Sequence, residues 1–243
     1  MNKITDDLDS TDWVLRQRCV KRMDWTPTPE QVENGLKDHV WEVRCAWVER
    51  TDWTPTFKQV EMGLAEEDWR VRVAWAKRTD WTPTFKQVEM GLNDYDACVR
   101  MVWVTRADHA PSPKQINNGL EDEYWRVRLG WAKRMDWTPT CEQVEMGLSD
   151  VVAWVREAWM NRLDYTLTME QIERGLNDPN PYIRKAWAGR QDFIPTNMQI
   201  ERLLNDPSSE VRDAWIGRLK MGIDGKLADN LRIEDGIDMD VSL

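Results

Sequence analysis

Two columns of arginine run along most of this chain with a fixed 28-residue period. The first comprises Arg16, Arg44, Arg72, Arg100, Arg128, Arg156, Arg184 and Arg212. The second lies six positions further on and comprises Arg22, Arg50, Arg78, Arg106, Arg134, Arg162, Arg190 and Arg218. A guanidinium group binds phosphate or carboxylate through two parallel hydrogen bonds. Such columns are suited to recognising an anionic partner, or to holding acidic side chains of the same chain.

The two columns are expected to have different environments, because six residues along a helix leave two side chains about 120° apart. Asp recurs at the same period and can pair with one column. We interpret the first column as an internal ladder and the second as free for a partner. The expected ladder residues are Arg44, Arg72, Arg100, Arg128, Asp52, Asp80, Asp108 and Asp136. The expected partner-binding arginines are Arg50, Arg78, Arg106 and Arg134.

One column of tryptophan persists mainly in the first half of the chain. It reads Trp13, Trp41, Trp69, Ala97, Trp125, Ala153, Pro181 and Ser209. A position that only fills the core should keep its residue in every repeat. Two interpretations therefore stay open: weakly constrained positions that tolerate solvent, or an exposed aromatic patch. Since Trp is a favoured residue at binding hot spots, we predict that the four tryptophans of this column contact a partner.

Features of an enzyme are sparse. His39 and His109 are the only histidines, and the sequence has no Gly-rich phosphate loop, nucleophile elbow or metal-ligand spacing. A catalytic set should be unique to one place, whereas Trp, Asp and Arg recur in every repeat. A row of loop aromatics is expected either to plug the seam between repeats or to stack on nucleobases. This row is Trp25, Trp53, Trp81, His109, Trp137, Tyr165 and Phe193. We predict a protein that is not an enzyme and uses no cofactor or metal.

These columns need a repeated scaffold, and the sequence predicts two short helices in each repeat. The first, the A helix, begins at a capping box such as Thr56 with Gln59 three positions later. The second, the B helix, carries Val-Arg-x-Ala-Trp-x-x-Arg, as at residues 71–78, with Val, Ala and Trp on one buried face. A Gly near the end of the A helix, such as Gly63, lowers helix stability. It indicates close approach of a neighbouring helix, or helix termination.

This pattern resembles a known group of repeat proteins. Asp-x-x-x-x-Val-Arg-x-Ala, followed by Thr-Pro before the next helix, is similar to the leucine-rich-repeat variant within the wider HEAT-like class of α-solenoids. The resemblance covers about residues 10–219. It is carried by Val43-Arg44, Val71-Arg72, Val99-Arg100, Val127-Arg128, Val155-Arg156, Ile183-Arg184 and Val211-Arg212, with Thr26-Pro27, Thr54-Pro55, Thr82-Pro83 and Thr138-Pro139.

The resemblance implies an all-α fold, a right-handed α-solenoid of about seven and a half 28-residue two-helix repeats. The period is longer than that of the variant repeat, and the Trp content is unusual for either group, so the B helix is open to being α throughout or partly 3₁₀. Folds of this class serve scaffolding, inhibition and nucleic-acid binding alike. The resemblance therefore indicates an architecture and leaves the partner open.

Three regions are expected along the chain. Residues 1–23 form an N-terminal cap and half repeat, residues 24–219 form seven repeats, and residues 220–243 form an acidic tail. Ile237, Met239, Val241 and Leu243 alternate with polar residues, as in a half-buried strand. We predict that the tail is a small β-hairpin. It would cap the end of the solenoid, or join two copies into a homodimer.

Charge and composition favour an acidic protein that binds other proteins. The net charge is −10, of which residues 221–243 contribute −4. This balance disfavours nucleic acid and anionic membranes. The four cysteines form no C-x-x-C pair and are interpreted as reduced packing residues. With neither a signal peptide nor a membrane span evident, we expect a cytoplasmic protein. We expect a monomer, or a homodimer formed through the C-terminal tail, whose partner is a protein with a basic surface. The alternative is nucleic-acid binding through one Arg column with stacked Trp.

Overall fold

The structure, a computed structural model, describes residues 7–220 of the chain. Over this range the regular secondary structure is α-helical, and no strand is present. The chain divides into two compact units, residues 1–131 and residues 132–243, which are described separately. None of the helices in residues 7–220 has the length and apolar character needed to cross a membrane.

The helices follow the predicted two-per-repeat order. In unit 1 they are α2 (Trp13–Val20), α3 (Pro29–Gly35), α4 (Trp41–Glu49), α5 (Phe57–Leu64), α6 (Trp69–Lys77), α7 (Phe85–Leu92), α8 (Ala97–Thr105) and α9 (Pro113–Leu120). In unit 2 they are α11 (Cys141–Leu148), α12 (Ala153–Met160), α13 (Met169–Leu176), α14 (Pro181–Trp187), α15 (Asn197–Leu204) and α16 (Ser209–Lys220). Between these two groups, α10 (Trp125–Lys133) contains the division. The B helices are α-helical, which settles the alternative between α and 3₁₀.

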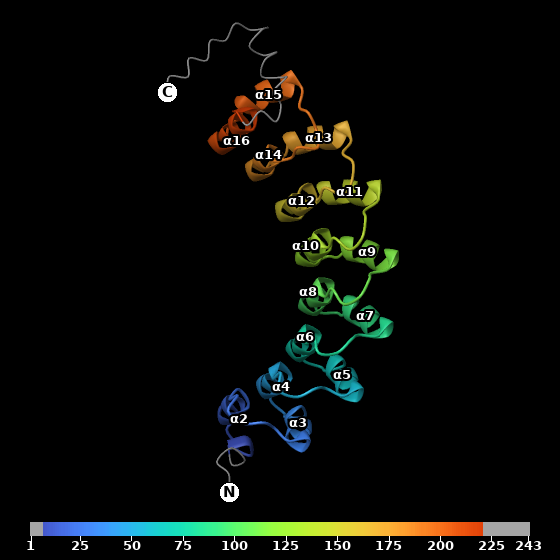
Figure 1. Cartoon of the computed structure of the whole chain (residues 1–243), viewed down its shortest axis with the longest axis vertical. Coiled ribbons are helices and arrows are strands. Elements are labelled where there is room, and N and C mark those ends of the chain that lie inside the picture. The colour runs from blue at the N-terminus through green and yellow to red at the C-terminus, as the bar shows by residue number, and fades with distance from the viewer. Residues whose placement is uncertain (1–6, 221–243) are drawn as a thin grey trace. The chain divides into compact units, whose positions relative to one another are not determined.

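Each unit consists of two layers of helices, as an α-solenoid requires. In unit 1 the A helices α3, α5, α7 and α9 form one layer, and the B helices α2, α4, α6 and α8 form the other (Figure 1). Successive B helices pack on one another, and each B helix also packs on the A helix of its own repeat. Unit 2 shows the same arrangement for α11 to α16. The predicted α-solenoid fold is confirmed.

The A helices begin at the predicted capping box. In α5 the Thr56 hydroxyl accepts from the Gln59 backbone N–H at 3.3 Å, and the Gln59 side chain accepts from the Thr56 backbone N–H at 2.8 Å. The same reciprocal pair begins α3, α7, α9, α11, α13 and α15. Because these bonds satisfy N–H groups that lack a partner within the helix, they fix where each A helix starts.

The core of each repeat is a buried B-helix tryptophan lying against the A-helix glycine. Trp47, Trp75 and Trp103 are at most 2% exposed, as are their equivalents up to Trp215. A Cβ atom placed on Gly63 would lie 2.0 Å from the indole nitrogen of Trp75. Close approach of the neighbouring helix is therefore the reason for this glycine. In the last repeat Leu203 replaces it, and there the Trp215 indole N–H donates to the Arg184 carbonyl at 3.4 Å.

The hairpin or cap predicted for the tail, residues 220–243, lies outside the described residues except for Lys220. At the other end, the half repeat predicted near Trp13 is present as α2. The side chain of Asp12 caps α2 by accepting from the backbone N–H of Val14 at 2.9 Å.

Candidate interaction surface

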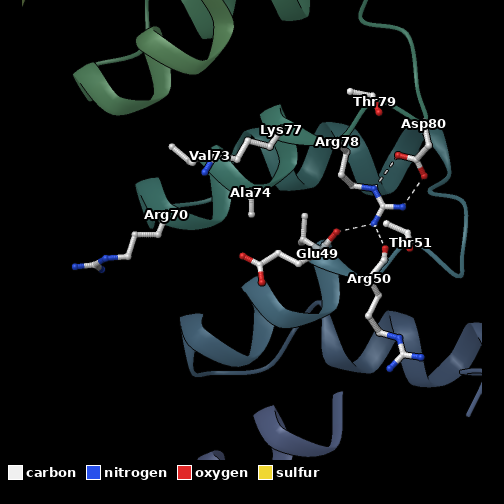
Figure 2. A pocket seen from close by; sticks show the side chains of 11 residues that line it. Glu49, Arg50, Thr51, Arg70, Val73, Ala74, Lys77, Arg78, Thr79 and Asp80 are labelled. Atoms are coloured by element: carbon white, nitrogen blue, oxygen red, sulfur yellow. Dashed lines mark hydrogen bonds and ion pairs between the residues drawn. The ribbon is translucent and has the colours of Figure 1, made fainter. Parts of the chain in front are cut away.

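The second Arg column lies inside the stack of repeats. The Arg78 guanidinium binds the Asp80 carboxylate at 2.9 and 2.5 Å, and it also donates to the carbonyls of Val48 and Arg50 at 2.6 and 2.8 Å. Figure 2 shows this guanidinium between the Asp80 carboxylate and the preceding repeat. Its central carbon lies 4.4 Å from the ring centroid of Trp53. The side chain is therefore saturated by its own chain.

The backbone acceptors explain why this column is internal. Val48 and Arg50 lie at the C-terminal end of α4, where helix carbonyls have no partner within the helix and carry partial negative charge. Arg78 thus caps the B helix of the preceding repeat. Arg50, Arg106 and Arg162 repeat the arrangement, with carbonyls of Val20, Ala76 and Ala132 as acceptors.

This burial corrects the expectation that the second column is free. Arg50, Arg78, Arg106 and Arg134 are each at most 9% exposed, and each is paired with the Asp two positions later. The two columns have different partners: Arg72 of the first binds an acid of the next repeat, and Arg78 of the second donates to carbonyls of the preceding repeat. We therefore leave these four arginines out of the proposed binding surface.

The first Arg column joins each repeat to the next through a second set of acids. Arg72 binds both carboxylate oxygens of Asp94 at 2.7 and 2.8 Å, and it donates to the Glu66 carbonyl at 2.7 Å. The equivalent pairs are Arg16–Asp38, Arg44–Glu66, Arg100–Asp122, Arg156–Asp178 and Arg184–Asp206. Arg128 keeps the backbone contact, donating to the Asp122 carbonyl at 2.7 Å.

The partner of this column differs from the predicted one. Asp52, Asp80, Asp108 and Asp136 pair with the second column, whose arginines lie two positions before them. The acids that serve the first column lie in the loop between the A and B helices of the next repeat. Their 28-residue period was visible in the sequence, and it is the signal that could have identified them.

The ladder carboxylates are stabilised in their charged form. Hydrogen bonds from Arg184 lower the pKa of Asp206 below its ordinary value, against the opposing effect of burial. Hydrogen bonds from Arg50 and Arg78 likewise lower the pKa of Asp52 and of Asp80. The hydrogen bond to Asp94 raises the pKa of Arg72. These are internal ion pairs, and their charge is cancelled within the repeats.

The loop aromatics also pack inward. Trp53 meets Trp75 edge-on, with ring centroids 6.1 Å apart, and its indole N–H donates to the Trp47 carbonyl at 3.1 Å. Trp25, Trp81 and Trp137 make the same edge contact with the buried tryptophan of the B helix that follows in their own repeat. With an arginine stacked on its face, each loop aromatic is an apolar plug over the seam between repeats.

The interrupted Trp column is the one that reaches the surface. Trp41, Trp69 and Trp125 are partly exposed at the first residue of their B helices, and Trp13 is 38% exposed. The Arg70 guanidinium carbon lies 4.3 Å from the ring centroid of Trp41 and 5.1 Å from that of Trp69. Asp68 holds the same guanidinium at 3.1 Å. Cation–π contacts of this kind fix the two indoles on the surface of unit 1.

A pocket of about 310 Å³ lies between α4 and α6, and Arg70 both lines it and contacts the two indoles. Glu49, Arg70, Val73 and Lys77 are among the residues that line it, and Figure 2 shows Arg70 extending away from the internal Arg78. The lining thus combines the apolar Val73 with charged side chains of both signs, such as Glu49 and Lys77. We call Trp41, Trp69, Arg70 and this pocket the α4–α6 surface.

Other exposed apolar side chains lie outside the predicted columns. Phe57 and Phe85 begin the A helices α5 and α7, and Met62 and Met90 lie about one turn further along. In unit 2 the exposed aromatics include Trp154 and Tyr182, at the second residue of α12 and α14. Sequence reasoning missed them because it followed columns that persist across many repeats.

When the two Arg columns and the two acid columns that pair with them are left out, the rest of the chain is strongly acidic. The two Arg columns take 16 of the 33 basic residues, and their two acid columns take 14 of the 43 acidic residues. The remainder is 17 basic residues against 29 acidic ones. A partner therefore meets a surface more acidic than the net charge of −10 suggests, because the internal pairs include more Arg than acid.

Comparison with known proteins agrees with this geometry. A solved structure described as a leucine-rich repeat variant with a novel repetitive protein structural motif aligns with a TM-score of 0.63 and 25% sequence identity. The alignment covers 88% of this chain and 80% of that one. A family model for the HEAT repeat associated with sister chromatid cohesion matches residues 199–216. The chain is a HEAT-like helical repeat protein.

The match to the HEAT model runs from within α15 into α16. No curated protein matched the chain. For this HEAT-like repeat protein, the comparisons thus describe the architecture. The nature of its partner has to be argued from the exposed residues.

Proposed function

We propose that this HEAT-like repeat protein is a non-enzymatic binding module that recognises a basic segment of another protein through the α4–α6 surface. The observation that carries the proposal is that the arginines of both columns are hydrogen-bonded within their own chain and, apart from the exposed Arg22, are buried or partly buried. What remains for a partner is an acidic exterior with partly exposed tryptophans. Carboxylates attract Lys and Arg side chains, and indole faces pack against their aliphatic stems and cations.

Acidic side chains lie around the α4–α6 surface, beside the basic Arg70 and Lys77 that line its pocket. Glu42 and Glu49 lie on α4, and Glu67 and Asp68 precede α6. Of these, Asp68 already holds Arg70, while Glu49 is exposed at the edge of the pocket. A basic side chain entering the pocket could therefore reach a carboxylate while its stem packs on Val73.

The alternative, nucleic-acid binding, requires a free ladder of guanidinium groups with aromatic side chains beside it. In unit 1 those guanidinium groups donate to backbone carbonyls and carboxylates of neighbouring repeats. The ladder geometry therefore favours the protein partner. A gel-shift assay with single- and double-stranded nucleic acid at low salt tests this alternative, and we expect no shift.

The proposal is tested by affinity capture from native extract, with three versions of the protein as bait. We expect the unmodified chain to enrich proteins with basic surfaces, and Trp69→Ala to lose them. Phe57→Ala is the matched control, because Phe57 is an exposed aromatic of the same unit in the other helix layer. Thermal unfolding checks that Trp69→Ala stays folded.

Two results would count against the proposal. Equal capture by Trp69→Ala and the unmodified chain would remove the α4–α6 surface from recognition. A salt-sensitive gel shift would instead favour the nucleic-acid alternative.

A further inference from the structure

The last repeat of unit 2 presents a face that earlier repeats bury. The eighth position, counted from the start of the B helix, is Ala132, Met160 and Ala188 in the preceding repeats, and these side chains are 0%, 1% and 6% exposed. Ile216 holds the same position in α16 and is 39% exposed. A large apolar side chain is therefore left in water where the stack would otherwise continue.

The same repeat also has an arginine without its carboxylate. Arg184 donates to the Asp178 carbonyl at 2.7 Å and binds both carboxylate oxygens of Asp206 at 2.7 and 2.8 Å. Arg212 keeps the equivalent backbone contact, to the Asp206 carbonyl at 2.6 Å, and a second at 3.1 Å to Pro207. Within residues 7–220, no carboxylate occupies the bidentate position on Arg212.

The acid column identifies what fits this position. Asp150, Asp178 and Asp206 follow the 28-residue period, and one further period brings the column to Glu234. The reach is sufficient, since the stretch from Lys220 to Glu234 is as long as that from Asp192 to Asp206 in the preceding repeat. A second copy stacked end to end would bring Ser10 to this position, which is a hydroxyl and not a carboxylate.

We propose that the C-terminal segment, residues 221–243, covers the open face of the last repeat, with the carboxylate of Glu234 bound to Arg212. The segment carries a charge of −4, which complements the guanidinium. The same docking removes Ile216 from water. This interaction is intramolecular and independent of the α4–α6 surface.

The first test measures how accessible the covered face is. Ile216→Cys is introduced into the full chain and into a chain that ends at Lys220, and alkylation of the new thiol is followed by peptide mass spectrometry. We expect the thiol at position 216 to react several-fold more slowly in the full chain. The native Cys141 is exposed at the start of α11 and serves as the internal reference in both proteins. Equal rates at position 216 would overturn the proposal.

The second test examines the ion pair. With Ile216→Cys as background, Glu234→Gln should raise the alkylation rate at position 216 toward that of the shortened chain. Asp235→Asn removes the neighbouring charge, outside the column register, and should leave the rate unchanged. Equal effects of the two substitutions would refute the specific pairing. Light scattering on the full and shortened chains tests whether a second copy covers the face instead. A mass that halves on shortening would show that it does, and would overturn the proposal.

Discussion

The indole nitrogen of Trp75 lies 2.0 Å from the position that a Cβ atom would take on Gly63. Gly35 with Trp47 and Gly91 with Trp103 show the same relationship, at 2.0 and 2.1 Å. Side chains do not tolerate such distances, so the tryptophan can occupy this place only because the A helix has no side chain there. The two residue types are therefore coupled in every repeat that has both.

Gly63→Ala should destabilise the protein, although alanine is the better helix former. Overpacking a core costs up to about 3 kcal/mol, and the contact with Trp75 is close enough for the full cost. Alanine gains about 1 kcal/mol in helix propensity over glycine. The net loss of stability is therefore about 2 kcal/mol. Gly217→Ala is the matched control, because a Cβ on Gly217 meets nothing within 4 Å. It should be neutral or slightly stabilising. Urea denaturation of both variants measures the difference, and equal stabilities would disprove the coupling.

Arg50→Ala should cost far more stability than Arg22→Ala in the same column. Arg50 is 3% exposed and donates to the carbonyls of Arg22 and Trp25, at 2.7 and 2.9 Å, as well as to Asp52. Its removal leaves buried acceptors and one carboxylate unpaired, which costs about 3 kcal/mol. Arg22 follows the first B helix of the described chain, and its exposed side chain pairs with Asp24. Thermal unfolding of the two variants tests this, and a similar shift in melting temperature would contradict the capping role.

Much of the fold could be predicted from the sequence because its signals are local. A capping box such as Thr56 with Gln59 acts within one turn, and its period gives the number of A helices. The spacing of Val71, Ala74 and Trp75 identifies the buried face of a B helix without knowledge of its neighbours. Both kinds of signal are read within a single repeat.

The roles of the arginines could not be predicted in the same way, because they depend on contacts between repeats. Arg78 donates to the carbonyl of Val48, 30 residues earlier, and a backbone acceptor leaves no mark on the residue type. The Arg72–Asp94 pair spans 22 residues. The sequence contains two periodic columns of acids, and it does not show which of them pairs with which Arg column. Trp41 and Trp69 pack against the core on one side, so their residue type alone does not show that they are partly exposed. The signal in the sequence was that their column is not continued in every repeat.

The cysteines should differ widely in reactivity. Cys141 is exposed, so the prediction that all four are packing residues is wrong for it. Cys45 is buried, and its burial raises the pKa of the thiol to about 12. Cys141 is exposed at the start of α11. Since the thiolate is the reactive form, iodoacetamide in mildly alkaline buffer should label Cys141 rapidly and Cys45 only after unfolding. Peptide mass spectrometry over a time course measures both. Rapid labelling of Cys45 in the native protein would mean that α4 opens locally.

Stability should fall steeply in acid because the ladder carboxylates have lowered pKa values. Asp52, Asp80, Asp192 and Asp206 each lie below the ordinary value, owing first to their hydrogen bonds with Arg50, Arg78, Arg190 and Arg184. A carboxyl group whose pKa is lower in the folded state contributes stability that is complete above its unfolded pKa of about 3.9. That contribution is lost as the pH falls through the lower folded value. We therefore expect the free energy of unfolding to be nearly constant from about pH 7 to 5 and to decrease below about pH 4.

A single substitution tests the source of this acid sensitivity. Asp80→Asn removes one titrating group and its ion pair with Arg78, so it should lower stability at about pH 7 and make the decrease below about pH 4 shallower. Urea denaturation of both proteins at a series of pH values gives the two slopes. Because unfolding takes up protons when the folded pKa is the lower one, the difference in slope reports the difference in proton uptake. If the two slopes coincide, Asp80 does not contribute to acid unfolding, and its pairing with Arg78 is not a source of pH-dependent stability.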